Sequence, residues 1–356
     1  MIPPAAPLAT LVNAALLVLL VGFFLVIGKT VLLPILAAVI VVYVLVSASE
    51  ALGRLPLVRR LPQGPRRALV LLLFAGAFIA LTFVVIGTIG QILAQAPSYQ
   101  ANIERLVAQG ADMLGLDERP DWGTIRDATF GRISIRRLVE TALANLTFVG
   151  GWVFLVIVYS AFLLAERAGF AAKLSAALRD PEDAARTEAI IRDINDRIGD
   201  YLAVKTLVNA ILGTVSFVVL WGVGIDFPLF WALAIALLNY IPYVGSLVGV
   251  ALPVALSVVQ FGQLGWTLLL AGLLIAAQVW VGSVLEPRLI GRRVNLSPFV
   301  VLTALAVWSA LWGLPGALLA VPLTSMLTIV LSAFAPTRPF AVLMADRVAV
   351  PARRAA

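Results

Sequence analysis

The sequence contains no histidine and no cysteine. Histidine is the commonest general base in enzymes, cysteine supplies thiol nucleophiles and disulfides, and both are usual ligands of zinc. Their absence removes most of the residues on which hydrolases and metalloenzymes rely. We therefore predict that the chain is not an enzyme and that it carries no metal or other cofactor.

Charged residues are also scarce. They make up 13% of the chain, whereas hydrophobic residues make up 62%; in soluble domains about a quarter of the residues are charged. A surface of this composition must be solvated by lipid, where helices satisfy all of their own backbone polar groups. The composition predicts an all-α polytopic integral membrane protein surrounded by the lipid bilayer.

The few charges give a formal net charge of +7. They lie in short segments between long apolar runs, which is the pattern of the positive-inside rule rather than of a nucleic-acid interface. We therefore expect no nucleic-acid partner. Apart from Lys29, Lys173 and Lys205 the basic residues are arginine, which suggests a GC-rich bacterial genome and residence in the bacterial inner (cytoplasmic) membrane.

Six apolar stretches are long enough to cross the hydrocarbon core, which takes about 20 helical residues. They cover residues 8–27, 31–52, 68–93, 148–165, 206–224 and 266–285. Two further apolar regions, 228–260 and 299–334, are interrupted near their middle by Asn239-Tyr-Ile-Pro-Tyr-Val-Gly245 and by Trp312-Gly-Leu-Pro-Gly316. Each interrupted region is either two short spans or one re-entrant hairpin.

Arginines between the spans predict the orientation. Residues 53–67 contain five arginines and no acid, so this loop and both termini should be cytoplasmic. Asp180, followed by Pro181 and two acids, has the composition of a helix start and predicts an amphipathic helix before the fifth span. The arginines of the loop after residue 285 and those of the C-terminal tail should both be cytoplasmic, and this requires each interrupted region to add an even number of crossings.

These expectations divide the chain into five parts. They are a three-span region over 1–93, an extracytoplasmic helical segment over 94–147, the fourth span and the amphipathic helix over 148–205, a transport core over 206–335 and a basic cytoplasmic tail over 336–356. Within the core, a full span followed by a broken pair occurs twice. The two copies would start on opposite sides of the membrane, as in the inverted repeats of secondary transporters.

Candidate functional residues lie at the breaks and at polar positions inside spans. A non-helical backbone is tolerated within lipid only where protein or a water-filled cavity satisfies it, so a break is either a solute site formed by helix ends or a tight turn between spans. Polar side chains inside spans either line a pathway or bond neighbouring helices. The candidates are Asn209, Asn239, Tyr240, Pro242, Gly245, Gln278, Glu286, Pro287, Gly313, Pro315 and Gly316.

Glu286 differs from the other candidates because it carries a charge at the end of a long apolar run. A carboxylate within the membrane is a functional hypothesis by default, here as the group that couples transport to a cation or a proton. The alternative is an interfacial glutamate paired with Arg288 or Arg292. No phosphate-binding loop of the form GxxxxGK[ST] occurs, so the chain should not hydrolyse ATP.

Several motifs of the second half resemble one known family. They are Gly222-Val-Gly-Ile-Asp-Phe-Pro228, Asn239-Tyr-Ile-Pro-Tyr-Val-Gly245, Glu286-Pro-Arg-Leu-Ile-Gly291, Leu296-Ser-Pro298 and Trp312-Gly-Leu-Pro-Gly-Ala-Leu-Leu-Ala-Val-Pro322. Their order and spacing are similar to those of the autoinducer-2 exporter family, also called the PerM-type permease family. Ser246 and Ser297 depart from it, since many members have proline and histidine there.

The resemblance implies about eight membrane segments of about 20 residues, inner-membrane residence and a homo-oligomer. It also implies a secondary transporter or exporter of a small polar solute such as autoinducer-2, working by alternating access. A sodium/proton antiporter is the alternative within transport. A non-transporting membrane scaffold, whose polar segments dock partners, is the alternative of another class.

Overall fold

The computed structural model describes residues 7–54, 56, 58–114, 135–178, 180–290 and 295–347. These residues form helices and short connections, and there is no strand among them. Seven of the described helices are long and apolar enough to cross a membrane. The prediction of an all-α polytopic membrane protein is therefore confirmed.

The chain folds into two compact units, each assembled from distant stretches of sequence. The first contains Met1–Tyr43, Val153–Ile198 and Val294–Ala356; the second contains Val44–Trp152 and Gly199–Arg293. The five-part division expected from the sequence follows chain order rather than this packing, and it stays a prediction. Arg292, Arg353 and Arg354, which supported the orientation, lie outside the described residues.

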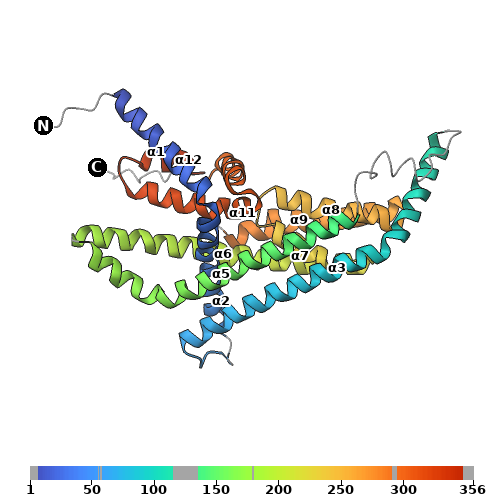
Figure 1. The fold of residues 1–356 in the computed structure, drawn as a ribbon, viewed down its shortest axis with the longest axis horizontal. Coiled ribbons are helices and arrows are strands. Elements are labelled where there is room, and N and C mark those ends of the chain that lie inside the picture. The colour runs from blue at the N-terminus through green and yellow to red at the C-terminus, as the bar shows by residue number, and fades with distance from the viewer. Residues whose placement is uncertain are drawn as a thin grey trace, which may run out of the picture. The chain divides into compact units, whose positions relative to one another are not determined.

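The second unit is built around antiparallel helices that lie side by side in Figure 1. They are α3 (Gln63–Leu114), the second half of α6 (Pro181–Val223), α7 (Pro228–Leu238), α8 (Val244–Phe261) and α9 (Leu264–Trp280). Apolar side chains of α6, α7, α9 and the α6–α7 connection form its core: Val208, Leu212, Leu220, Ile225, Ala232, Ile235, Leu270 and Leu274. α8 covers this core through Val250 and Val254.

α6 begins and ends where its sequence dictates. The Asp180 carboxylate accepts a hydrogen bond from the Glu182 amide at 2.8 Å, which confirms the predicted cap. At the other end Gly224 has a φ of +80°, and the Ile225 amide reaches back to the Leu220 carbonyl at 2.9 Å. Glycine is favoured at this left-handed position after a helix. Pro228 then starts α7, because an amide hydrogen at the first position of a helix would have no partner within the helix and proline has none.

The first predicted break is the turn between α7 and α8. Gly245 makes the turn tight: a β-carbon on it would lie 1.9 Å from the Leu238 carbonyl oxygen. Gly249, one turn later, passes Ile235 at ordinary contact distance, so the small-residue spacing serves close packing. α7 has 11 residues and extends about 17 Å at 1.5 Å per residue, too short to cross the hydrocarbon core alone.

α9 does not end at Trp280. It continues through a π-helical turn, η2 (Val281–Leu285), into α10 (Glu286–Ile290), and the Glu286 amide donates to the Val281 carbonyl five residues back. A proline inside an α-helix clashes with the carbonyl four residues before it. The wider turn next to Pro287 relieves that clash; the sequence predicts an apolar stretch that ends at residue 285 and no π-helical turn.

The first unit contains α1 (Pro7–Ile27), the start of α2 (Lys29–Leu52), parts of α5 (Ile135–Ala177) and α6, α11 (Pro298–Ala333) and α12 (Arg338–Met344). The second predicted break is confirmed inside α11, where Gly313 has a non-helical φ of +65°. The Trp308 indole donates to the Thr324 hydroxyl at 3.0 Å. In a straight helix these residues would be about 24 Å apart, so the two arms of α11 fold against each other.

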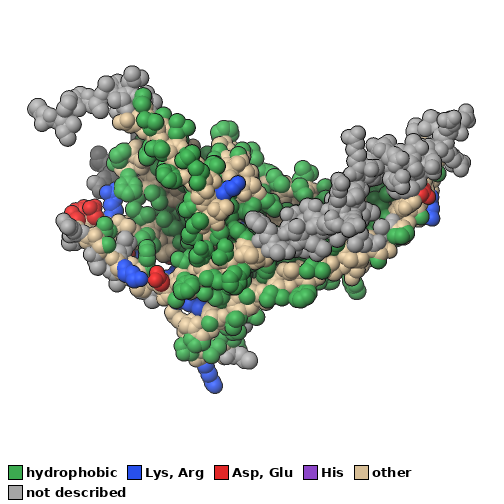
Figure 2. Space-filling view, viewed as in Figure 1, with side chains coloured by type: hydrophobic (Ala, Val, Ile, Leu, Met, Phe, Trp, Pro, Cys, Tyr) green, Lys and Arg blue, Asp and Glu red, His purple; other side chains and the backbone are tan. Residues whose placement is uncertain are grey.

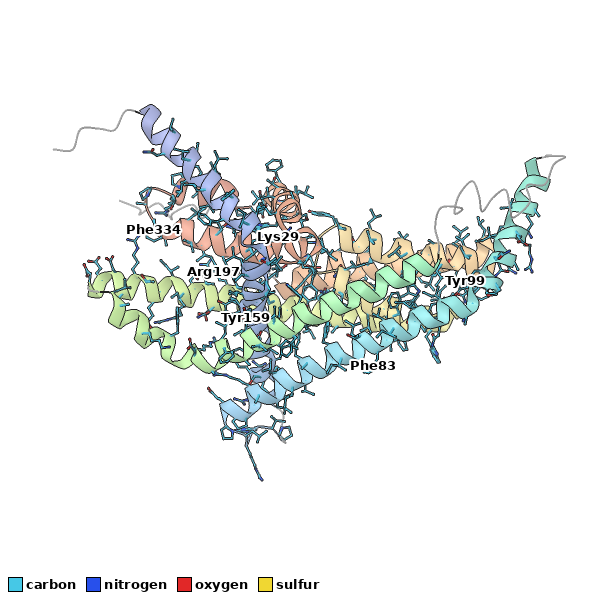
Figure 3. The ribbon with its side chains drawn as sticks, viewed as in Figure 1. Lys29, Phe83, Tyr99, Tyr159, Arg197 and Phe334 are labelled. Carbon is cyan, nitrogen blue, oxygen red and sulfur yellow. The ribbon has the colours of Figure 1, made fainter. Side chains whose placement is uncertain are left out.

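α3 extends well beyond its predicted span. It continues from residue 93 to Leu114 as one helix, and Figure 3 shows Tyr99 on this extension, farther along α3 than the exposed Phe83. The Tyr99 hydroxyl bonds to Asp226 at 2.8 Å, and the Asn102 amide donates to the Gln260 carbonyl at 2.7 Å. Burial raises the pKa of the Tyr99 phenol and the bond to Asp226 raises it further, so the phenol stays protonated.

Large apolar side chains cover the outside of the helices. Phe83, Leu72 and Trp221 are each at least 70% exposed, and hydrophobic side chains dominate the face in Figure 2, with charges gathered at few places. In water such a surface would aggregate. In a bilayer it is the lipid-facing surface. Polar groups in the interior of each unit are therefore shielded from water and need hydrogen-bond partners within the protein.

Candidate functional site

A polar stripe runs along the buried face of α6 in the second unit. Tyr201, Lys205, Asn209 and Ser216 are all less than a tenth exposed. The first three are spaced by four residues, which places them one above another on a helix, and the third is seven residues from Ser216. Leu212 and Leu220 of the same helix belong to the apolar core. The four polar side chains are therefore enclosed in the interior of a membrane protein.

Lys205 and Glu286 form an ion pair at the centre of this stripe. The Lys205 Nζ donates to Glu286 Oε1 at 2.6 Å, and the side chains are 5% and 27% exposed. Tyr201 is buried beside them and lies within electrostatic range of both Glu286 and Tyr240. The arrangement brings two opposite charges from residues 81 positions apart into one place.

Among the described residues, the ion-pair partner of Glu286 is Lys205 and not Arg288. The sequence suggested Arg288 or Arg292, both close along the chain, but Arg292 lies outside the described residues and Lys205 occupies Glu286 Oε1. The reason is helical geometry: Arg288 follows Glu286 by two residues, and side chains at this spacing point to different sides of a helix. Lys205 reaches the carboxylate because it lies on another helix.

One turn along α6 from Lys205, three more predicted residues meet. The Asn239 Nδ2 donates to Asn209 Oδ1 at 2.8 Å, and both side chains are buried. The Tyr240 hydroxyl lies 2.8 Å from the Thr206 hydroxyl. The first break is thus a tight turn, and it brings Asn239 and Tyr240 against the polar face of α6; that it binds a solute stays a prediction.

Within this group one hydrogen-bond donor is left over. Asn209 Nδ2 makes no hydrogen bond of ordinary geometry with any residue that the structure describes, although the Tyr240 side chain lies next to it. Asn209 is 2% exposed, and an unpaired buried donor costs about 1–3 kcal/mol. A buried donor beside other polar groups is suited to a ligand that brings an acceptor.

We call Tyr201, Lys205, Thr206, Asn209, Asn239, Tyr240 and Glu286 the polar cluster. Its charges compensate each other, and its remaining groups are amides and hydroxyls. Such groups donate to and accept from polar molecules without requiring a net charge on them. The cluster is also where the backbone departs from regular α-helix, at the α7–α8 turn and at η2.

The other predicted residues lie around the polar cluster or away from it. Pro242 and Gly245 shape the turn without joining the cluster, and Pro287 follows Glu286 directly. Gln278 lies on α9 two turns before Glu286, and its buried Nε2 also has no partner among the described residues. The second break, with Gly313, Pro315 and Gly316, belongs to the first unit, so the structure does not place it in this site.

Three members of the polar cluster were not predicted from the sequence: Tyr201, Lys205 and Thr206. Tyr201 and Lys205 lie in the polar segment before the apolar stretch, and Thr206 is the first residue of that stretch. None of them stood out as a polar residue inside a span. The spacing Tyr201, Lys205, Asn209 was the available signal, because polar residues every fourth position mark one face of a helix. The ion pair with Glu286 left no local signal.

Comparison with known proteins gives a consistent result. The family profile described as AI-2E family transporter matches residues 14–335. A Haemophilus influenzae protein provisionally named a transport protein is 29% identical over 323 residues, which are 87% of this chain and 91% of that protein. The AI-2 transport protein TqsA of Escherichia coli strain K12 is 34% identical over 209 residues, 59% of this chain and 60% of TqsA.

Proposed function

Because the chain belongs to the AI-2E family of transporters, we propose that it exports a small polar solute, of the autoinducer-2 kind, by alternating access. That it is a multi-pass membrane transporter follows from the family and from its seven apolar helices. The solute is suggested by the relative TqsA, whose name gives AI-2 transport as its role. The direction and the mechanism are part of the proposal.

The observation that carries the proposal is the polar cluster with its unused donor. Asn209 Nδ2 is buried beside the Tyr240 side chain without a hydrogen bond of ordinary geometry, and the Tyr240 hydroxyl in turn lies against that of Thr206. A small solute with hydroxyl or carbonyl oxygens would accept from this amide and exchange hydrogen bonds with the hydroxyls. We place the solute contact at Asn209, Asn239 and Tyr240, with Pro242 and Gly245 fixing the turn that presents them.

Irregular helices support an alternating-access mechanism. Transporter sites are commonly formed where membrane helices are broken, because the broken ends offer polar backbone groups. Here a turn, a π-helical segment and the kinked α11 interrupt otherwise continuous helices. Gln278, Gly313, Pro315 and Gly316 are proposed pathway residues outside the polar cluster, and the inverted repeat of two span-plus-broken-pair units stays a prediction.

We further propose that the protein resides in the bacterial inner membrane with both termini in the cytoplasm, as a homo-oligomer. The arginine-rich loop at 53–67 supports this orientation through the positive-inside rule. Exposed aromatic and aliphatic side chains on the described helices give lipid or a second copy an apolar surface to contact.

The proposal predicts a transport defect without a folding defect. In the double variant Asn209→Leu/Asn239→Leu both partners of a buried hydrogen bond become apolar, a change that is close to neutral for stability. The solute loses at least one hydrogen bond, so flux should fall by about tenfold or more. The measurement is flux of autoinducer-2 and other small polar solutes into everted vesicles, beside a melting curve of the purified protein.

Thr214→Val is the matched control, because Thr214 lies on the same helix, is exposed and donates its hydroxyl to the Ala210 carbonyl one turn before it. Its flux should equal that of the unaltered protein. A double variant that transports every tested solute at full rate would refute the solute contact. If no solute moves even with the unaltered chain, while deletion of residues 94–147 abolishes function in cells, the scaffold alternative is favoured.

A sodium/proton antiporter is the second candidate, and one observation favours it: Glu286 is a mostly buried carboxylate in an apolar unit. Such a group binds a cation or a proton readily. In this structure, however, an ammonium group of the protein already occupies it.

A further inference from the structure

Two Lys–Glu ion pairs among the described residues differ sharply in their surroundings. Lys173 and Glu166 lie 3.6 Å apart with side chains that are 67% and 66% exposed. Lys205 and Glu286 lie 2.6 Å apart with exposures of 5% and 27%. The first pair is solvated and contributes little, whereas the second joins a mostly buried carboxylate to an almost fully buried ammonium.

A mostly buried carboxylate needs a positive partner. Removing an ionised group from water is strongly unfavourable unless a counter-charge and hydrogen bonds compensate it. At Glu286 the ammonium of Lys205 supplies that charge at hydrogen-bond distance. If Lys205 were absent, Glu286 would have to take up a proton or bind a cation from the medium.

Oxygen atoms near Glu286 suit a small hard cation. Tyr201 carries a hydroxyl on the same buried face of α6 as Lys205, one turn before it. Pro287 has no amide hydrogen, so the carbonyl of Gly282 or Ser283, which residue 287 would otherwise bond within the helix, lacks its helical donor. In transporters with broken helices, backbone carbonyls released from the helix coordinate sodium or protons, and a carboxylate supplies the negative charge that a bound cation needs.

We propose that Glu286 is a latent monovalent-cation site and that the Lys205 ammonium occupies the place of the cation. Lys205 thus determines the cation specificity of this site, because its ammonium balances the charge of the Glu286 carboxylate and excludes sodium. One consequence rests on the proposed transport function: solute flux through this chain does not depend on a sodium gradient. The site itself is independent of that function.

The test is a set of melting curves of the purified full-length chain in detergent, with sodium chloride or choline chloride at equal ionic strength. The unaltered protein should melt at the same temperature in both salts. Lys205→Met should melt lower in choline and gain on the order of 3 °C in sodium, since a ligand that binds only the folded state raises Tm. Lys205→Met/Glu286→Gln should show no gain.

Lys173→Met is the matched control, because it breaks the exposed pair, and it should respond to sodium no more than the unaltered protein. If Lys205→Met does not yield folded protein, Lys205→Gln, which keeps a hydrogen-bond donor without the charge, takes its place. A sodium-dependent rise of Tm in the unaltered protein would overturn the proposal and favour the antiporter. A lysine variant that melts identically in both salts would overturn it as well.

These curves can be interpreted whether or not a solute is known. Absence of solute flux in vesicles would count against the proposed function and leave the sodium response of Lys205→Met unaffected. Conversely, solute flux that requires sodium in the unaltered protein would support the proposed transport function and contradict the proposal that Lys205 occupies the cation site.

Discussion

Gly245→Ala is expected to lower the free energy of unfolding by about 3 kcal/mol or more. The added β-carbon would lie 1.9 Å from the Leu238 carbonyl oxygen and 2.8 Å from the Asn239 Cα. Both obstacles are backbone atoms, so no side chain can rotate away and the α7–α8 turn must open. Opening it would also move Asn239 away from Asn209. The measurement is denaturant-induced unfolding of the purified protein in detergent.

Two other glycines in the second unit calibrate this effect. At Gly249 the nearest atom to an added β-carbon is the Ile235 Cα at 3.4 Å, so Gly249→Ala should cost far less. At Gly272, on α9, nothing lies within 4 Å, and alanine should stabilise the helix by up to about 1 kcal/mol. If Gly245→Ala were as stable as Gly272→Ala, the tight turn described here would be wrong.

Glu286→Gln is expected to cost about 3 kcal/mol or more, because it leaves the Lys205 ammonium buried without a counter-charge. Lys205→Met should cost less, since the remaining Glu286 carboxylate is 27% exposed whereas the Lys205 side chain is 5% exposed. The double variant Lys205→Met/Glu286→Gln removes both charges and should be more stable than Glu286→Gln alone. Unfolding of the three variants at fixed salt measures this cycle.

The order of these stabilities is the decisive result. Strong coupling between the two positions means that the two single costs add to more than the cost of the double variant. Additive costs would show that Lys205 and Glu286 do not interact in the folded protein. The exposed pair Lys173 and Glu166, treated in the same way, should show weak coupling of less than about 1 kcal/mol.

Local features of the fold could be predicted from the sequence. Asp180 and Pro181 marked the start of α6 because capping depends on neighbouring residues only. The break at Asn239–Gly245 followed from Pro242 and Gly245, and the break near Gly313 from glycine and proline, since these residues restrict or free the backbone wherever they occur. Long apolar runs gave the membrane helices for a similar reason.

Features that depend on distant residues could not be predicted. Lys205 and Glu286 are 81 residues apart, and nothing local to either one announces the other. The π-helical turn compensates for Pro287, but a kink or a helix end would have satisfied the same sequence. Whether α3 would stop at residue 93 or continue depended on Asp226 and Gln260, which Tyr99 and Asn102 contact from far along the chain.

The candidate site shows the same division. Asn209, Asn239, Tyr240 and Glu286 were selected as polar residues in apolar stretches, and the structure gathers all four in the polar cluster. Gly313, Pro315 and Gly316 were selected by the same reasoning about breaks, yet they belong to the other unit. A break in the sequence shows where the backbone is irregular, but not which side chains lie beside it.

The central claim is that the transported solute passes the polar cluster. The chain has no native cysteine, so Thr206→Cys introduces a single thiol beside Tyr240, and Thr214→Cys introduces one on the exposed side of the same helix. The measurement is the rate at which a small thiol reagent labels each variant, with and without a solute that gives flux in vesicles. We predict that the solute slows labelling at 206 and leaves 214 unchanged; equal labelling rates at 206 with and without that solute would contradict the account.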